Sequence, residues 1–331
     1  MIDYIKTFLY KKFNILEHNS NLKTEILAGI TNYFTLIYLV MLVPEILMNV
    51  FYNQVLVNGK QLGYFVLDNG LTLNEMLVAL TAASFICSGV SSIIMGYLTN
   101  LPFVQGPSLA VGTFITYTVC LNFGYSYNQA LAIVFISAFI FFILALFGME
   151  KKIHKAIPKN IKYAVTCGIG LFIAYQGLLK AHIIDQSSIN TNLFDLSTIT
   201  SKDTKTALLA LAGVILITIL HKKHIYGSIF IGKIICILLA FPLGLISLEK
   251  INFFTPISLD AIFFKLNFNG IIDFSNSSIM FKTLITLLVV LFSICIMDIF
   301  ETMAMLIVAD NFVEISKERF ANKNIPQILE I

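Results

Sequence analysis

Two acidic residues stand inside one of the most apolar stretches of the chain. Asp298 and Glu301 interrupt a run of Ile, Met and Phe, and Thr302 follows directly. Their spacing of three residues puts both on one face of a helix. Because a charged side chain costs roughly 2.5–3.5 kcal/mol at the centre of a membrane helix, such acids are expected to face the protein interior. They predict a proton carrier or an acceptor for a substrate N–H, with Glu301 the first choice. The alternative is that one acid only caps or bridges neighbouring helices.

A second candidate site is a break in an apolar block. Pro102, Gly106 and Pro107 cannot continue a helix. The apolar run after them, Leu109–Leu121, is short for a bilayer that needs ~20 residues. Non-helical backbone at membrane depth is tolerated only where protein or a water-filled cavity satisfies it. The break therefore predicts a site for a polar or anionic ligand atom, with Ser108 as the N-cap of the following helix. The alternative is a plain loop before a short, tilted helix.

Other kinds of chemistry find no support in the sequence. It contains no nucleophile–base set, phosphate-binding glycine loop or metal-ligand cluster, so we expect no enzyme, no cofactor and no metal. The basic segment from Lys151 to Lys162 could suggest a nucleic-acid contact. A cytoplasmic loop that sets membrane topology is the favoured interpretation, and the same loop can touch anionic lipid. No nucleic-acid partner is therefore expected.

The elements that position these residues are predicted to be membrane helices. The chain has 331 residues, of which 57% are hydrophobic and 12% are charged, against about 25% charged in soluble domains. Long apolar blocks predict an all-α polytopic protein that spans the bilayer. The predicted spans are Ile26–Met48, Val78–Tyr97, Leu109–Leu121, Gln129–Phe147, Ile161–Leu179, Ala207–Leu220, Ser228–Ile246 and Thr283–Val308. The third and the sixth are short for a bilayer.

Lysine placement predicts the orientation of these spans. Lysines are concentrated in the N-terminal arm and in the segment from Lys151 to Lys162, whereas the loops 49–77, 180–206 and 247–282 are long and less basic for their length. Under the positive-inside rule, the N-terminus and the basic segment are cytoplasmic and the long loops are external.

Several segments in series resemble one family. Glu25–Thr31, Asn100–Phe103, Ala156–Lys159, Gly168–Ala174 and Asp298–Thr302 resemble, in their order and spacing, the adenine/guanine/hypoxanthine permeases of the nucleobase–cation symporter superfamily. The resemblance runs from about residue 22 to 310. It implies proton-coupled uptake of a purine base at the plasma membrane, by a fold of fourteen spans in two inverted seven-span repeats. Each repeat contributes to a core domain and a gate domain.

The resemblance also implies the site residues. In the family, the site lies between the broken third and tenth spans and the acid-bearing eighth span. The substrate contacts carried over are Pro107, Ser108, Leu109, Gly112 and Glu301, and the proton-coupling residues are Asp298 and Glu301. The sequence departs from the family pattern in two ways. The segment Ser108–Thr113 replaces a run that contains Gly and Asn, and Glu301 stands where Asp is usual.

The same resemblance divides the chain into parts. These are a cytoplasmic arm (1–25), spans 1–4 of the core (26–147), spans 5–7 of the gate (148–246), an external loop (247–282), span 8 of the core (283–308) and a cytoplasmic tail (309–331). Spans nine to fourteen are not represented, which predicts a C-terminally truncated permease. A separate chain or a homo-oligomer is then expected to complete it. The alternative is a non-transporting, degenerate or accessory membrane protein.

Overall fold

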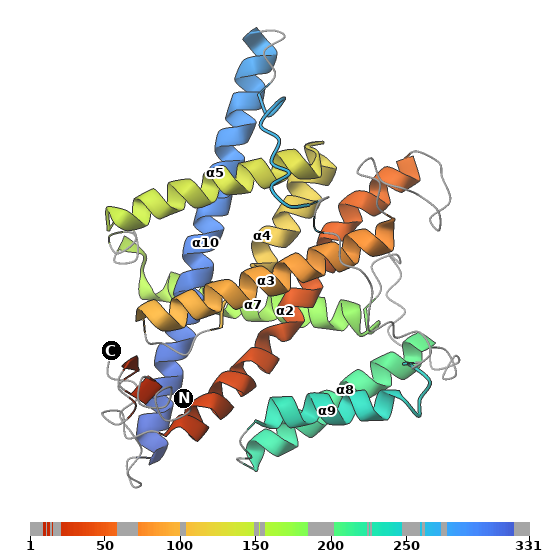
Figure 1. The fold of residues 1–331 in the computed structure, drawn as a ribbon, viewed down its shortest axis with the longest axis vertical. Coiled ribbons are helices and arrows are strands. Elements are labelled where there is room, and N and C mark those ends of the chain that lie inside the picture. Colours follow the sequence, from red (N-terminus) through yellow and green to blue (C-terminus); the bar gives the residue numbers. More distant parts are fainter. Residues whose placement is uncertain are drawn as a thin grey trace. The chain divides into compact units, whose positions relative to one another are not determined.

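The computed structural model describes residues 9–10, 12–13, 15, 21–57, 72–99, 104–148, 152, 156–184, 202–223, 225, 227–246, 259, 262–272 and 277–320. Within these ranges the regular elements are helices, labelled in Figure 1. The chain divides into two compact units, one formed by 1–166 with 257–331 and the other by 167–256. The predicted division into core and gate parts stays a prediction.

The first unit is built from long apolar helices around a broken one. They are α2 (Leu22–Val57), α3 (Leu73–Thr99), α4 (Leu109–Thr113) with the π-helix η1 (Phe114–Asn122), α5 (Tyr127–Leu146) and α10 (Ser277–Phe320). Helix α7 (Lys159–Lys180) runs from this unit into the second. Helix α2 packs on α3 and on α4, and α10 packs on α5 and α4. Figure 1 shows α4 (yellow) next to the long α10 (blue).

The core of this unit lies where the broken helix meets its neighbours. Met48 of α2, Met76 of α3, Val119 of η1, Ile133 of α5 and Ile294 of α10 are all almost completely buried in one hydrophobic cluster. Large apolar side chains elsewhere on the same helices stay exposed in the isolated protein, as side chains that face lipid do.

Sequence features explain where α5 begins. The Ser126 hydroxyl accepts a hydrogen bond from the Gln129 backbone, and the Gln129 side chain accepts one from the Ser126 backbone, which forms a capping box. The Gln129 amide also donates to the Asn269 carbonyl at 2.9 Å, and the Asn267 N–H donates to the Asn128 carbonyl at 3.1 Å. The segment that precedes α10 is thereby fastened to the start of α5.

In the second unit, α8 (Lys202–Lys222) and α9 (Ser228–Ala240) pack side by side. A Cβ on Gly213 would lie 2.7 Å from the sulfur of Cys236, and one on Gly232 would lie 2.3 Å from Cγ1 of Ile217. Small residues at this interface let the two backbones approach closely, as is common between membrane helices.

The described helices confirm the all-α polytopic prediction. Six are long and apolar enough to cross a membrane, and the helices Leu109–Asn122 and Ser228–Ala240 are shorter. The sixth predicted span was too short, because α8 has 21 residues and includes the polar residues before Ala207. The seventh predicted span was too long, because α9 ends at Ala240 and a turn with Gly244 at φ 70° follows.

The end of the last helix also differs from the prediction. Helix α10 continues to Phe320, beyond the predicted end at Val308, because a helix can continue through charged residues after its apolar part ends. Within the predicted break, Asn100–Phe103 lie outside the described residues. The predicted tail beyond Phe320 also lies outside them.

Candidate substrate site between the broken helix and α10

The approach to the broken helix, residues 104–108, is non-helical backbone held by α3. Gln105 lies in this stretch, and its N–H donates to the Ser92 hydroxyl at 2.8 Å. The Ser88 hydroxyl donates to the carbonyl of the same residue. Both polar groups of the Gln105 backbone are therefore satisfied by protein, as non-helical backbone at membrane depth requires.

Ser108 connects the broken helix to α10. It adopts an extended conformation (φ −67°, ψ 124°), and its hydroxyl accepts a hydrogen bond from the Val111 N–H at 3.1 Å, which confirms the predicted N-cap. The same hydroxyl donates to Oε2 of Glu301. Two residues predicted from separate patterns, a helix break and an intramembrane acid, thus meet in a direct contact.

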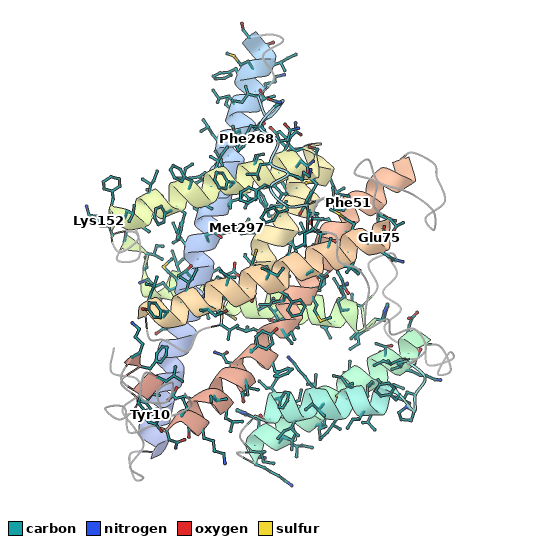
Figure 2. The ribbon with its side chains drawn as sticks, in the orientation of Figure 1. Tyr10, Phe51, Glu75, Lys152, Phe268 and Met297 are labelled. Atoms are coloured by element: carbon teal, nitrogen blue, oxygen red, sulfur yellow. The ribbon has the colours of Figure 1, made fainter. Side chains whose placement is uncertain are left out.

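Glu301 lies among other ionisable or polar groups. Asp298 is one turn earlier on α10, and the phenol of Tyr38 of α2 lies close enough to Glu301 to be affected by the charge of its carboxylate. All three side chains are partly buried. Thr302 is exposed, and its hydroxyl donates to the Asp298 carbonyl at 2.8 Å within α10. Figure 2 labels Met297, the residue before Asp298, on the stretch of α10 beside α4.

The other predicted site residues have different surroundings. Leu109 is 3% exposed, so its side chain belongs to the packed interior, and Pro107 is partly exposed near the end of the non-helical stretch. Gly112 is buried against α2: an added Cβ would lie 2.9 Å from Cγ1 of Val43. Gly112 therefore sets how closely the broken helix approaches α2, whereas Ser108 and Glu301 carry the polar groups.

The continuation of the broken helix is a π-helix. In η1 the Thr116 side chain is completely buried, and its hydroxyl donates to the Gly112 carbonyl at 2.9 Å. The Asn49 amide of α2 donates to the Tyr117 hydroxyl at 3.3 Å. Such wide turns occur often at functional sites. Apolar spacing over so short a run does not distinguish a π-helix from an α-helix, which is why the sequence did not predict it.

Three polar residues at the site were not predicted. Ser88 and Ser92 are four residues apart on α3, and Gln105 lies within the predicted break. The spacing of the serines was a usable signal, since residues at i and i+4 share a helix face. The sequence gives no indication that this face of α3 would contact the non-helical stretch before the broken helix.

The Ser108–Glu301 pair offers both a hydrogen-bond donor and an acceptor. A carboxylate accepts hydrogen bonds, whereas a serine hydroxyl can both donate and accept. The pair can thus satisfy an N–H and a neighbouring acceptor on one ligand. Among the described residues, no group of three His, Cys, Asp or Glu side chains could hold a metal ion.

Comparison with known proteins identifies the family. The model of a permease family matches residues 23–325. A permease-like protein of Methanocaldococcus jannaschii is 31% identical over 302 residues, which cover 91% of this chain and 60% of that protein. The guanine/hypoxanthine permease PbuO of Bacillus subtilis is 30% identical over 72% of this chain and 49% of its own length. The adenine permease AdeQ of Escherichia coli is 26% identical over 69% of this chain and 45% of its own length.

These relatives are named as permeases rather than as enzymes, and the chain spans about half the length of the curated relatives that it matches. The family match covers nearly all of the residues that form the six long apolar helices. The chain therefore belongs to this permease family and is a multi-span membrane protein.

Proposed function

We propose that this chain forms the purine-binding part of a nucleobase permease of the adenine, guanine and hypoxanthine class. The observation that supports it most directly is the hydrogen bond from Ser108 of the broken helix to Glu301 of α10. Relatives of matching sequence are named for guanine, hypoxanthine and adenine transport. We assign substrate contacts to Pro107, Ser108, Leu109, Gly112 and Glu301.

The chemistry of a purine suits this pair of groups. A purine base presents N–H donors next to ring nitrogen or carbonyl acceptors in one plane. In the proposed bound state, Glu301 accepts a purine N–H while the Ser108 hydroxyl turns to donate to a neighbouring acceptor. The ligand thus replaces the contact that the two residues make with each other. Leaving either partner unpaired inside the membrane would cost about 1–3 kcal/mol, which favours a ligand that pairs with both.

We further propose that the transport is coupled to protons through Asp298 and Glu301. Two neighbouring carboxyl groups repel each other when both are charged. A proton taken up with the substrate removes that repulsion and lets the other carboxylate bind the purine. The partial burial of both side chains and their position on one face of α10 support this assignment.

The location and assembly belong to the same proposal. We place the protein in the plasma membrane with its N-terminus in the cytoplasm, in accord with the lysine distribution. Because the chain spans about half the length of its relatives, the remaining spans are assigned to further sequence, a separate chain or a second copy.

The direct test is uptake of radiolabelled hypoxanthine, guanine and adenine in cells that lack purine uptake. These 331 residues are expressed alone and together with the product of the downstream reading frame, and the amount in the membrane is measured. Uptake that competes with unlabelled purines and collapses with the proton gradient is the expected result in at least one arrangement. Absence of uptake in both, with protein present in the membrane, would favour a non-transporting, permease-like protein.

A further inference from the structure

Helix α3 contacts the non-helical stretch before the broken helix through two side chains one turn apart. Ser88 is 4% exposed, and its hydroxyl donates to the Gln105 carbonyl. The Ser92 hydroxyl accepts from the Gln105 N–H at 2.8 Å and donates to the Ser88 carbonyl at 2.6 Å. We call Ser88, Ser92 and the Gln105 backbone the serine brace.

The brace has the geometry of a fixed point. The N–H and the carbonyl of Gln105 both face α3, where Ser92 and Ser88 bond them, so the two contacts restrict the rotation of this backbone unit as well as its position. Many helical serines bond only to the backbone of their own helix. Ser91 does so, because its hydroxyl donates to the carbonyls of Cys87 and Ser88.

The fixed point lies close to the site along the chain. Only Gly106 and Pro107 separate Gln105 from Ser108. Pro107 has a restricted φ and no N–H, so it limits the paths that the backbone can take. No atom outside its own chain neighbours lies within 4 Å of a Cβ built on Gly106, so this side of Gly106 is not closely packed. The brace is therefore the anchored contact that precedes Ser108.

We infer that Ser88 and Ser92 are positioning residues of the permease, which hold Gln105 so that the Ser108 hydroxyl meets Glu301. The inference rests on the proposed function for its effect on uptake. Its structural content, that α3 sets the placement of Ser108, does not depend on which substrate is carried.

The first arm of the test is transport kinetics of Ser88→Ala and Ser92→Ala. Ser92→Thr keeps a hydroxyl, and Ser91→Ala is the matched control on the same helix. Loss of one net hydrogen bond of about 0.5–1.5 kcal/mol corresponds to a rise in KM of roughly 2- to 10-fold. We expect this rise in Ser92→Ala, with the maximal rate per molecule in the membrane largely kept, and wild-type KM in Ser92→Thr and Ser91→Ala. A purely structural role would instead reduce the amount of protein and leave KM unchanged.

The second arm needs no transport. The background is a cysteine-free variant of the chain, in which alanine replaces Cys87, Cys120, Cys167, Cys236 and Cys295. In this background Ser108→Cys introduces a single thiol, and its rate of reaction with a membrane-permeant maleimide reports the placement of position 108. We expect Ser92→Ala to raise this rate several-fold and Ser91→Ala to leave it unchanged. If Ser88→Ala does not reach the membrane because Ser88 is buried, the less buried Ser92 position decides the question.

The outcomes separate the two proposals. If the wild type takes up no purine but the maleimide rate responds to Ser92→Ala, the proposed function fails and the positioning role stands. If the wild type transports but Ser92→Ala changes neither KM nor the maleimide rate, the positioning role is overturned and the proposed function is unaffected. The positioning role would also be overturned if Ser91→Ala changed KM and the maleimide rate as much as Ser92→Ala does.

Discussion

At the scale of single residues, the site combines one acid and one hydroxyl that belong to elements far apart in the sequence. Ser108 serves two purposes, since its hydroxyl caps α4 and also donates to Glu301. This double use explains why a serine suits the position: its hydroxyl can accept and donate at the same time.

Glu301→Gln tests the acid. The amide keeps the size of the side chain and can still accept from Ser108, so the fold is expected to be kept. It loses the negative charge and the ability to take a proton. Loss of a charge-assisted contact of about 1.5–3 kcal/mol corresponds to roughly 10- to 100-fold weaker substrate binding, and uptake should fall to background. Purine uptake is measured between pH 5 and 8, with membrane abundance as the control. Full uptake by the variant with unchanged pH dependence would remove Glu301 from the mechanism.

Ser108→Ala and Ser108→Thr test the Ser108 hydroxyl. Alanine removes the N-cap, which costs about 1 kcal/mol of stability, and also the donor to Glu301. Threonine keeps the hydroxyl. We expect the alanine variant to lose most uptake at normal membrane abundance, and the threonine variant to keep a substantial part of it. Equal uptake in the alanine variant and the wild type, measured as initial rates, would place the substrate elsewhere.

At the scale of the elements, the broken helix is positioned by close packing on α2. Gly112 lies against Val43, which is 5% exposed and β-branched, so its side chain has little freedom to move aside. Gly112→Ala would place a methyl group 2.9 Å from Cγ1 of Val43. The strain of overpacking is typically about 1–3 kcal/mol, and it should displace the broken helix away from α2.

The matching rescue is the double variant Gly112→Ala with Val43→Ala. It removes the atoms with which the new methyl group collides. We expect Gly112→Ala to lower the thermal stability in detergent and the uptake rate, and the double variant to recover part of both relative to the two single variants. If the double variant were as impaired as the sum of the single changes, the contact with Val43 would not be the cause. Gly106→Ala is the control, because no neighbour lies within 4 Å of its added Cβ.

The sequence was a good guide to which elements exist and a poorer guide to their form. Apolar blocks predicted the membrane helices, and the prolines with Gly106 predicted the break. The polar start of α8, the early end of α9 and the π-helix η1 were not predicted. In each of these cases backbone hydrogen bonding, which composition does not reveal, decides the boundary. The Ser108–Glu301 contact was expected only through the family resemblance, because a single sequence does not show which helices are neighbours.

At the scale of the whole molecule, orientation in the membrane remains a prediction, and the structure supplies positions that test it. Lys12 of the N-terminal arm lies over the ring of Tyr97, near the end of α3, with its Nζ 4.1 Å from the ring centroid. Such cation–π contacts are stronger where water is excluded, and they suit the boundary of a membrane. Asn269 is next to the start of α5, to which Gln129 fastens it.

The two positions are expected on opposite faces of the membrane, since the basic segment after α5 is assigned to the inside and α5 must begin outside. In the cysteine-free background, Lys12→Cys and Asn269→Cys are treated on intact cells with a membrane-impermeant maleimide. In intact cells we expect labelling at position 269 but not at position 12, because the positive-inside rule places the N-terminal arm in the cytoplasm. Position 12 should be labelled only after the cells are permeabilised. Labelling at 12 in intact cells, with 269 protected, would invert the orientation. The proton gradient would then have to act on Glu301 from the other side, and the direction of coupled transport would need to be reassigned.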